Sequence, residues 1–418
     1  MILALVLYFM SAICQADTNL AYSTIGPLIF QVKTAASENS EKSSYGSGFV
    51  VDQHGLLITN YHVVVDHIWN NDSSKIYVKI DGKNFEATVM KIDVINDLAL
   101  IKVDHTFSQK IVLAKNEPAN GDQIFTLGLP EDLEWTVVAG VYNGLTKSGP
   151  RDLFYMSTAL NHGMCGGPTV NSKYELVAVN ASVKKDGALI SFGVPLQAVK
   201  DIIASPDVFE GNRLQVIEKQ LTDFQEKMTT QILTGITKAK KLKGVIVPDF
   251  TEWFKCWGST ENAAKSSVEK QTEYCGNDLG SIMVSDDVEE GFFNAFFGSV
   301  TNKSLNPFAW QENKSKDVLA TSRKYLLADF FNSKADLTFS KPKCKNQNVK
   351  NGSSFITTDL CFQKLNEFND ILDSKITLFK PLGSNKYLFA RFGLYGFSRK
   401  NILKITSALT GFDYENPL

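Results

Sequence analysis

Gly-Met-Cys-Gly-Gly-Pro, at positions 163–168, places a single thiol, Cys165, among glycines. Glycine adopts backbone conformations that other residues avoid, so this run can form a tight loop around the thiol. In such a loop the backbone N–H groups of Gly163 and Cys165 can point toward one negatively charged oxygen. The ordinary alternative is a simple turn beside a buried cysteine, because Gly-Gly-Pro is common turn chemistry and free cysteine packs like a small hydrophobe.

Two residues far upstream supply what a reactive thiol requires. A thiol nucleophile needs a base within hydrogen-bond reach, and the base usually needs a group that orients it. His62 follows the apolar run at 56–58, and Asp97 opens the apolar run at 98–101. Either residue alone is more often structural. In the order His62, Asp97, Cys165 they predict a catalytic triad, in which His62 exchanges protons with Cys165 and Asp97 fixes the imidazole tautomer.

The residues around this triad are patterned as short strands. Alternating or apolar β-forming runs recur from about 46 to 199, separated by turns such as Asp81-Gly82 and Gly121-Asp122. Helical patterning is scarce until a helix is expected to start at Pro195. Many short strands with glycine-containing turns favour an all-β barrel or sandwich.

Four stretches of this region resemble the trypsin-fold proteases of the HtrA/Deg type. They read Gly-Ser-Gly-Phe-Val at 46–50, Thr-Asn-Tyr-His-Val-Val at 59–64, Asn-Asp-Leu-Ala-Leu-Ile-Lys at 96–102, and Gly-Met-Cys-Gly-Gly-Pro-Thr-Val-Asn at 163–171. The resemblance implies two six-stranded antiparallel β-barrels with an active site in the cleft between them. It also implies an oxyanion hole formed by the amides of Gly163 and Cys165. It covers less than half of the chain.

The sequence departs from that family at the nucleophile, where Cys165 stands in place of serine. The Gly-x-Cys-Gly-Gly form is similar to the trypsin-fold cysteine proteases of RNA viruses, which usually read a substrate glutamine with a histidine downstream of the cysteine. The comparable position here is Asn180, so specificity for glutamine is not expected. The candidate substrate-binding residues are Ala159, His162, Asn180 and Ala181. No PDZ-like segment follows, which argues against the caging role of HtrA proteins.

The first sixteen residues are expected to be a secretory signal peptide. An apolar run at 2–10 leads into small residues, with a plausible cleavage site before Asp17. An uncleaved N-terminal strand or anchor is the alternative. No other apolar run approaches the ~20 residues that span a bilayer. The protein is therefore expected to be exported, periplasmic or secreted, without stable membrane insertion after cleavage.

The second half of the chain contains four cysteines: Cys256, Cys275, Cys344 and Cys361. An even set in an oxidising compartment predicts disulfides. Of the three possible pairings, Cys256–Cys275 with Cys344–Cys361 is favoured because it joins sequence neighbours. Metal binding is not expected, since the spacings are long and no histidine lies nearby. Cys165 then remains as the odd thiol.

The chain of 418 residues is too long for one core and is expected to have several parts. We expect a signal peptide at 1–16, a mobile lead-in at 17–44 with a possible strand at 25–32, and a trypsin-like domain at 45–205. An amphipathic helix follows within 206–243, and a disulfide-bonded α+β domain occupies 244–418. The helix is indicated by an apolar stripe: Leu214, Ile217, Leu221, Phe224, Met228 and Ile232. In the last part, 318–331 and 360–372 are expected to be helical and 387–397 a strand.

The sequence as a whole predicts an exported endopeptidase that acts on proteins or peptides and needs no cofactor. A formal net charge of -2 gives no argument for a nucleic-acid partner. The main alternative is a trypsin-fold pseudoprotease that binds rather than cleaves. A third possibility is a structural protein whose function lies in the C-terminal half. Oligomeric state is not predicted.

Overall fold

The computed structural model describes residues 18–38, 40, 43–69, 73–130, 135–146, 151–183, 189–204, 212–238, 240–242, 245–247, 249–250, 254–261, 267–276, 282–285, 288–312, 339–351 and 354–410. The expected signal peptide at 1–16 lies outside them. The chain divides into two compact units, residues 1–147 with 151–213, and residues 148–150 with 214–418. The main division falls inside the segment 206–243 that the sequence assigned to a linking helix.

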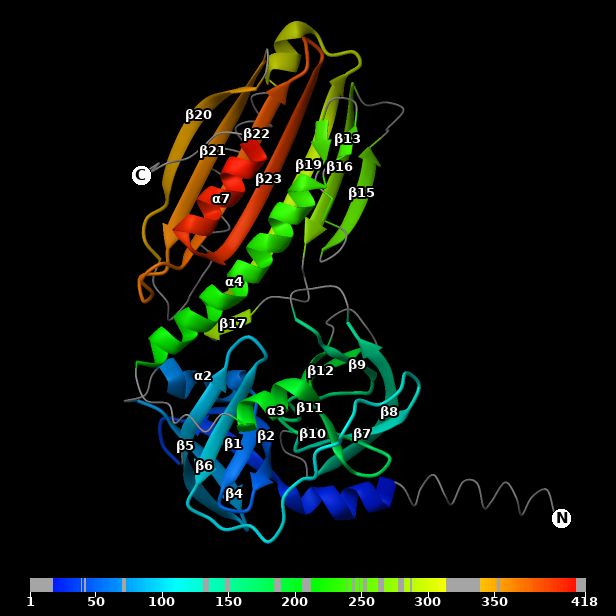
Figure 1. The fold of residues 1–418 in the computed structure, drawn as a ribbon, viewed down its shortest axis with the longest axis vertical. Helices are drawn as coiled ribbons and strands as arrows, with labels where there is room; N and C mark the ends of the chain where they lie inside the picture. The colour runs from blue at the N-terminus through cyan, green and yellow to red at the C-terminus, as the bar shows by residue number, and fades with distance from the viewer. Residues whose placement is uncertain are drawn as a thin grey trace, which may run out of the picture. The chain divides into compact units, whose positions relative to one another are not determined.

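Two closed six-stranded antiparallel barrels make up most of the first unit (Figure 1). The first has the order β1-β2-β3-β6-β5-β4 and the second β10-β11-β12-β9-β8-β7. Their strands are β1 (Ile29–Ala35), β2 (Ser43–Asp52), β3 (Leu56–Thr59), β4 (Lys75–Ile80), β5 (Lys83–Asp93), β6 (Leu98–Val103), β7 (Gln123–Gly128), β8 (Thr136–Leu145), β9 (Phe154–Ser157), β10 (Pro168–Asn171), β11 (Leu176–Val183) and β12 (Ser191–Pro195). The expected two-barrel, trypsin-like arrangement is confirmed.

One apolar core serves both barrels. It includes Phe49 of β2, Phe125 of β7 and Phe154 of β9, each at most 1% exposed. Close-packed interiors resist relative movement of their parts. The loops that the two barrels contribute to a common site are therefore held in a fixed relation.

The expected mobile lead-in is instead part of the first barrel. Residues 18–25 form a helix, followed by the short helix η1 (Gly26–Leu28). Strand β1 then pairs with both β2 and β4 and closes the barrel. Ala21 and Ile25 are buried, so apolar packing and strand pairing fix this segment. The first strand begins at Ile29, later than the expected 25–32.

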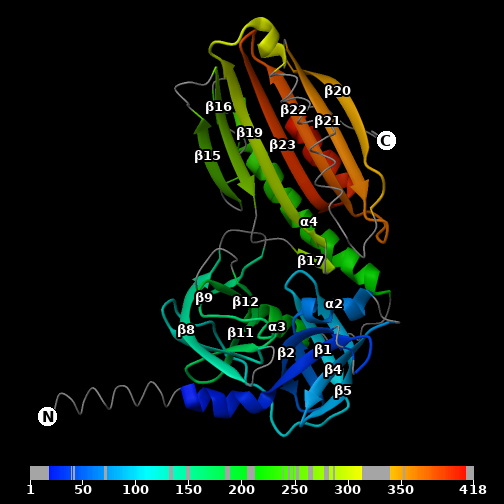
Figure 2. The same ribbon diagram turned by 180° about the vertical axis from the view of Figure 1, so that it is seen from behind.

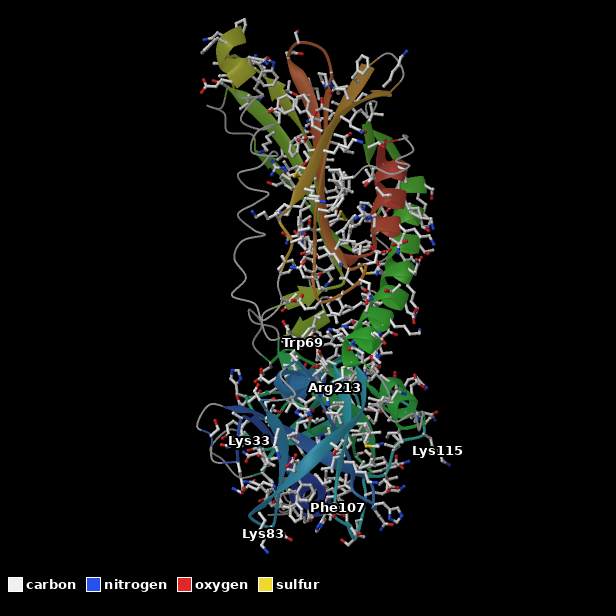
Figure 3. All side chains as sticks on the ribbon, turned by 90° about the vertical axis from the view of Figure 1, so that its left-hand side faces the viewer. Lys33, Trp69, Lys83, Phe107, Lys115 and Arg213 are labelled. Carbon is white, nitrogen blue, oxygen red and sulfur yellow. A yellow bond between two sulfur atoms is a disulfide. The ribbon has the colours of Figure 1, made fainter. Side chains whose placement is uncertain are left out.

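Helices α2 (Tyr61–Trp69) and α3 (Leu196–Ala204) also accompany the barrels. The start of α3 directly after Pro195 agrees with the sequence. Arg213 donates from Nη1 to the carbonyl oxygen of His67 at 3.0 Å, close to Trp69 at the end of α2 (Figure 3). A cation at this position is favourable because the last carbonyls of a helix carry partial negative charge. It stabilises the helix whose first turn contains His62.

The second unit is built on a seven-stranded antiparallel sheet of order β15-β16-β19-β23-β22-β21-β20. Its helices α4 and α7 lie on one face of the sheet, in front in Figure 1 and behind in Figure 2. The elements are α4 (Arg213–Thr237), β13 (Lys240–Leu242), β14 (Val245–Val247), β15 (Lys255–Glu261), β16 (Val268–Gly276), β17 (Ile282–Ser285), β18 (Val288–Glu290), β19 (Phe292–Asn302), β20 (Lys343–Asn351), β21 (Ser354–Lys364), β22 (Leu372–Pro381), β23 (Lys386–Phe397) and α7 (Arg399–Thr410).

The sequence predicted some of these elements correctly. The long helix exists as α4, and its buried face includes Ile217, Leu221, Phe224 and Met228 of the expected stripe. The strand expected at 387–397 is β23. The helix expected at 360–372 is wrong, because residues up to Lys364 belong to strand β21 and pair with β20 and β22. The helix expected at 318–331 lies outside the described residues.

The two disulfides are those favoured by the sequence, Cys256–Cys275 and Cys344–Cys361. In each, the two cysteines are direct partners across neighbouring antiparallel strands. Because β15 and β20 are the two outer strands of the sheet, each disulfide ties an edge strand to its inner neighbour.

Within the described residues, none of the helices combines the length and apolar character that crossing a bilayer requires.

Candidate active site

Asp97 holds His62 through both carboxylate oxygens. Its Oδ2 accepts from Nδ1 of the imidazole at 2.8 Å, and its Oδ1 accepts from the backbone N–H of His62 at 2.9 Å. The backbone bond satisfies one of the N–H groups that the first turn of α2 leaves without a helical partner. One side chain thus fixes the ring orientation of His62 and the start of the helix that carries it.

Asn60 fixes the conformation of Asp97 in turn. Asp97 has a φ of +57°, which is unusual for a residue with a side chain. The buried Asn60 donates from Nδ2 to the backbone oxygen of Asp97 at 2.8 Å. Asn60 belongs to the histidine motif at 59–64, but the motif predicted no role for it. Its only signal was its position two residues before His62.

The environment of His62 favours the protonated imidazole. Burial lowers the pKa of His62, but the negative charge of Asp97 and its hydrogen bond to the ring raise it. A hydrogen bond and charge interaction with Cys165 act in the same direction. Together they hold the pKa of His62 well above its usual value near 6.5. The side chain of His62 is still 26% exposed, so it can reach a bound molecule.

The thiol of Cys165 lies between an imidazole and a carbonyl group. Cys165 is a half-buried residue of the loop that joins β9 to β10, and the structure describes it as a free cysteine. Its sulfur interacts with His62 and donates to the carbonyl oxygen of Ala181 at 3.2 Å. The β11–β12 register shifts between Asn180 and Ser182, so Ala181 occupies a bulge. Bulges commonly redirect backbone groups beside active sites.

Gly163 and Cys165 present two backbone N–H groups beside the thiol. Gly163 has a φ of +87°, a conformation that favours glycine. Neither N–H has an acceptor among the residues that the structure describes. Two such amides on either side of one residue form the kind of donor pair that stabilises a developing oxyanion.

Asn180 has a different role from the one expected. Its side chain is fully buried. Nδ2 donates to the carbonyl oxygens of Leu127 at 2.8 Å and Met164 at 3.1 Å, and Oδ1 accepts from Oγ1 of Thr169 at 2.7 Å. The amide group of Asn180 therefore bonds within the protein and supports the cysteine loop, and contact of Asn180 with a substrate stays an untested prediction.

The remaining candidate substrate-binding residues are accessible. Ala159 and Ala181 are half-buried and His162 is exposed. His162 precedes Gly163 directly, and Ala181 contacts the Cys165 sulfur through its carbonyl oxygen. Contact of these three residues with a substrate stays a prediction.

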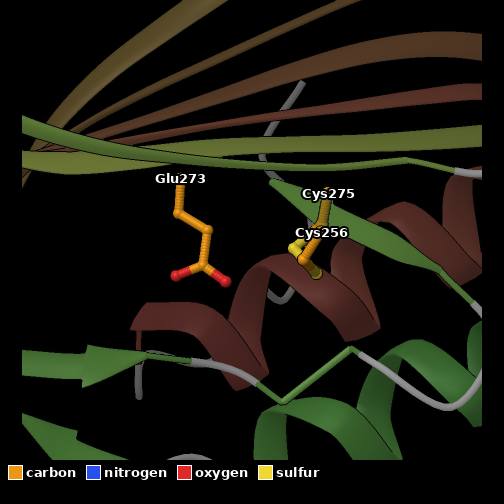
Figure 4. A group of neighbouring side chains, drawn as sticks. All are labelled: Cys256, Glu273 and Cys275. Atoms are coloured by element: carbon orange, nitrogen blue, oxygen red, sulfur yellow. A yellow bond between two sulfur atoms is a disulfide. The ribbon is translucent and has the colours of Figure 1, made fainter. Parts of the chain in front are cut away.

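The described residues contain one group with the composition of a metal site. Glu273 lies beside Cys256 and Cys275, with the potential ligand atoms within 4.8 Å of one another (Figure 4). The two sulfurs are bonded to each other, however, and a metal requires the free thiolate. The carboxylate of Glu273 is therefore the one ligand of this group that remains free to bind a metal, and a single ligand does not make a metal site.

Comparison with known proteins finds similarity to trypsin-like peptidases in part of the chain. The family model described as "Trypsin-like peptidase domain" matches residues 46–179. Serine protease HTRA2, mitochondrial, of Drosophila grimshawi is 36% identical over 168 residues, which are 38% of this chain and 38% of the relative. Serine endoprotease DegS of Escherichia coli K12 is 31% identical over 207 residues, which are 45% of this chain and 57% of the relative.

A solved structure, the active form of the Rv3671c protease of M. tuberculosis, is 23% identical and covers 47% of this chain and 87% of its own, with a TM-score of 0.42. The chain spans between about two fifths and three fifths of the length of the curated relatives. The residues matched by the family model, 46–179, include His62, Asp97 and Cys165. Residues 46–179 of the first unit thus match a trypsin-like peptidase domain, and part of the chain is similar to serine proteases of the HtrA/Deg type.

Proposed function

We propose that the protein is an exported endopeptidase that cleaves peptide bonds with Cys165 as nucleophile. The observation that carries the proposal is the position of His62, which contacts the Cys165 sulfur on one side and the Asp97 carboxylate on the other. A base held in one tautomer beside a thiol is the arrangement that nucleophilic catalysis requires.

The reaction would follow from these contacts. In the resting pair the thiol proton has passed to His62, and the Cys165 thiolate attacks the carbonyl carbon of the substrate. The carbonyl oxygen becomes an oxyanion that accepts from the amides of Gly163 and Cys165. His62 then gives its proton to the leaving amine, and a thioester remains on Cys165. Water, deprotonated by His62, attacks the thioester, and the returning proton restores the thiol as the carboxylic acid leaves.

The substrate backbone has a place beside this site. Strand β10 pairs with β11 as far as Val179, and the backbone of Asn180 bonds to Gly166 and Gly167, so β11 continues beyond these partners from Ala181, whose carbonyl oxygen contacts the Cys165 sulfur. An extended peptide can pair with such a strand through its main chain, and side-chain pockets then set its preference. Unfolded or flexible protein segments would be the substrates, since they can adopt this extended form.

Thiol labelling tests the activated nucleophile. The full-length protein would be treated with iodoacetamide from pH 5 to pH 9, alongside His62→Ala. Because the thiolate is the reacting form, we expect Cys165 to be alkylated at acidic pH much faster in the wild type than in the variant. An identical pH dependence in both proteins would favour the inactive pseudoprotease.

Proteolysis tests the reaction itself. We expect the wild type to degrade labelled casein and Cys165→Ala to lose this activity completely. Cys165→Ser should retain measurable hydrolysis, because the His62–Asp97 pair is the one that a serine hydroxyl also needs. Casein left intact by the wild type under conditions where Cys165 labels rapidly would contradict the endopeptidase proposal.

The proposal of export is supported by the two disulfides, since such bonds persist mainly in oxidising compartments. Mass spectrometry of the protein recovered from the periplasm or medium of a bacterial host should find an N-terminus at Asp17. Recovery of the uncleaved chain from the cytoplasm alone would oppose it.

A further inference from the structure

Ser47 of β2 makes three hydrogen bonds to loops of the second barrel, although it belongs to the first. Its backbone N–H donates to the carbonyl oxygen of Cys165 at 2.8 Å. Its hydroxyl donates to the carbonyl oxygen of Gly163 at 2.7 Å and accepts from the N–H of Leu129 at 2.9 Å. Ser47 is fully buried, so water does not compete for these bonds.

These bonds orient the loop that carries the thiol. Three successive carbonyl groups, those of Gly163, Met164 and Cys165, all accept hydrogen bonds from the protein. Ser47 holds the first and third, and Asn180 holds the second at 3.1 Å. With the carbonyls directed into the protein, the amides of Gly163 and Cys165 are left to donate elsewhere.

The Gly163 carbonyl is the one that depends on a side chain of the first barrel. The Leu129 N–H occupies an acceptor position of the Ser47 hydroxyl and so directs its proton toward Gly163. Without that hydroxyl, the buried carbonyl would lose its donor, and a buried acceptor without a partner is costly. The peptide unit of this carbonyl also contains the Met164 N–H, which donates to the carbonyl oxygen of Asn161 at 3.1 Å. It lies between the two units that carry the Gly163 and Cys165 N–H groups. A rotation of this unit would change the backbone torsions of Gly163 and Met164 and would thereby reorient the two neighbouring amides.

We propose that Ser47 is a positioning residue for the oxyanion hole, acting by holding the Gly163 carbonyl so that the Gly163 and Cys165 amides face the substrate oxygen. The inference rests on the proposed function. It assigns Ser47 an effect on acyl transfer that is separate from the activation of the thiol by His62.

Two reactions of the same cysteine separate these effects. Casein hydrolysis passes through an oxyanion and needs the two amides. Alkylation by iodoacetamide displaces iodide from a saturated carbon, so it needs the thiolate but forms no oxyanion. Both rates would be measured on the full-length wild type and on Ser47→Ala. We expect casein hydrolysis to fall about tenfold or more and the alkylation rate to stay within about twofold.

Thr34→Val is the matched control. Thr34 is also fully buried in the first barrel, and its hydroxyl donates to the carbonyl oxygen of Val63 at 2.8 Å. The variant loses a comparable bond without touching the cysteine loop, and it should change hydrolysis and alkylation in equal proportion. If Ser47→Ala does not fold, Ser47→Cys retains a weaker donor in a slightly larger side chain. Under reducing conditions it should show a smaller loss of hydrolysis, while the alkylation rate of Cys165, followed by peptide mapping, stays unchanged.

Three outcomes would overturn the inference. Equal loss of both rates in the Ser47 variant would mean that it supports the fold or the thiol in general. Unchanged hydrolysis would mean that the hydroxyl does not matter for the reaction. A wild type that labels with iodoacetamide but never cleaves casein would remove the endopeptidase proposal, and the role of Ser47 with it.

Discussion

Gly166 lies so close to Ser47 that a Cβ atom added to the glycine would stand 2.2 Å from the Ser47 carbonyl oxygen. The same atom would stand 2.6 Å from Oγ1 of Thr59. Gly166 also has a φ of +83°, which other residues rarely adopt. The close approach of the two barrels beside the thiol therefore requires glycine at this position.

We predict that Gly166→Ala displaces the cysteine loop and lowers casein hydrolysis at least about a hundredfold, because the obstacle is a backbone atom that cannot rotate away. Gly82→Ala is the control. Gly82 has a φ of +77° but no atom within 4 Å of the added Cβ. It should cost about 1–2 kcal/mol of unfolding free energy from backbone strain alone and leave hydrolysis unchanged. Equal activity of both variants would show that the contact does not position the loop.

Asp97→Asn should lower casein hydrolysis by about 10²–10⁴-fold. The amide can donate to the imidazole and so favour the wrong tautomer, and it removes the charge that raises the pKa of His62. That pKa should fall, so the protonated imidazole would be lost at a lower pH than in the wild type. NMR titration of the His62 ring would measure this shift. An unchanged titration with reduced hydrolysis would limit the effect of Asp97 to tautomer and orientation.

The sequence predicted both barrels, and the neighbourhood of His62, Asp97 and Cys165, because the signals there are local. Each pattern involves only a few residues that are neighbours in the sequence: a glycine in a tight loop, a histidine after an apolar strand, or an Asp-Gly turn. The role of Asn180 is different. An asparagine has the same local pattern whether it faces a substrate or a buried carbonyl, and only the position of the Met164 and Leu127 carbonyls decides between them.

Strand β21 shows the complementary failure. Burial alternates at 355–360, but the four consecutive residues 360–363 are all buried, so the alternation that marks a strand ends where the expected helix begins. The apolar residues from Leu360 to Leu372 then match a helical spacing by coincidence. Pairing with β20 and β22, together with the Cys344–Cys361 disulfide, decides the conformation, and such long-range contacts override local preference.

Each disulfide should protect its own edge of the seven-stranded sheet. The bonds close loops of similar length, with sequence separations of 19 for Cys256–Cys275 and 17 for Cys344–Cys361. Replacing either pair by serine should lower the unfolding free energy of the second unit by about 2–4 kcal/mol. Hydrogen exchange should accelerate in β15 for the first replacement and in β20 for the second. Acceleration of the same strand in both variants would contradict this independence.

Glu290 of β18 and Asp373 of β22 form a buried carboxyl pair in the second unit, 1% and 5% exposed. Burial raises the pKa of Asp373 to about 6, against the hydrogen bonds from the Gly396 N–H and Gln363 and the charge of Lys375. Burial and the charge and hydrogen bond of Asp373 raise the pKa of Glu290 well above its usual value. Two carboxyl groups in contact favour a shared proton.

This pair should make the second unit less stable as pH rises. In the unfolded chain both carboxyls titrate near pH 4. The folded state therefore holds more protons between about pH 4 and pH 6 and above, and its stability falls across that range. Glu290→Gln keeps the shape of the side chain but cannot ionise beside Asp373. The stability of this variant relative to the wild type should therefore increase from pH 4 to pH 7. Asp359→Asn, which removes a half-buried carboxylate of β21, corrects for the general loss of one acid. Calorimetry on the full-length protein would measure the unfolding of the second unit, recognised as the transition that the Cys256–Cys275 replacement shifts. If the difference in stability between Glu290→Gln and the wild type stayed constant from pH 4 to pH 7, the carboxyl pair would not control the pH dependence of stability.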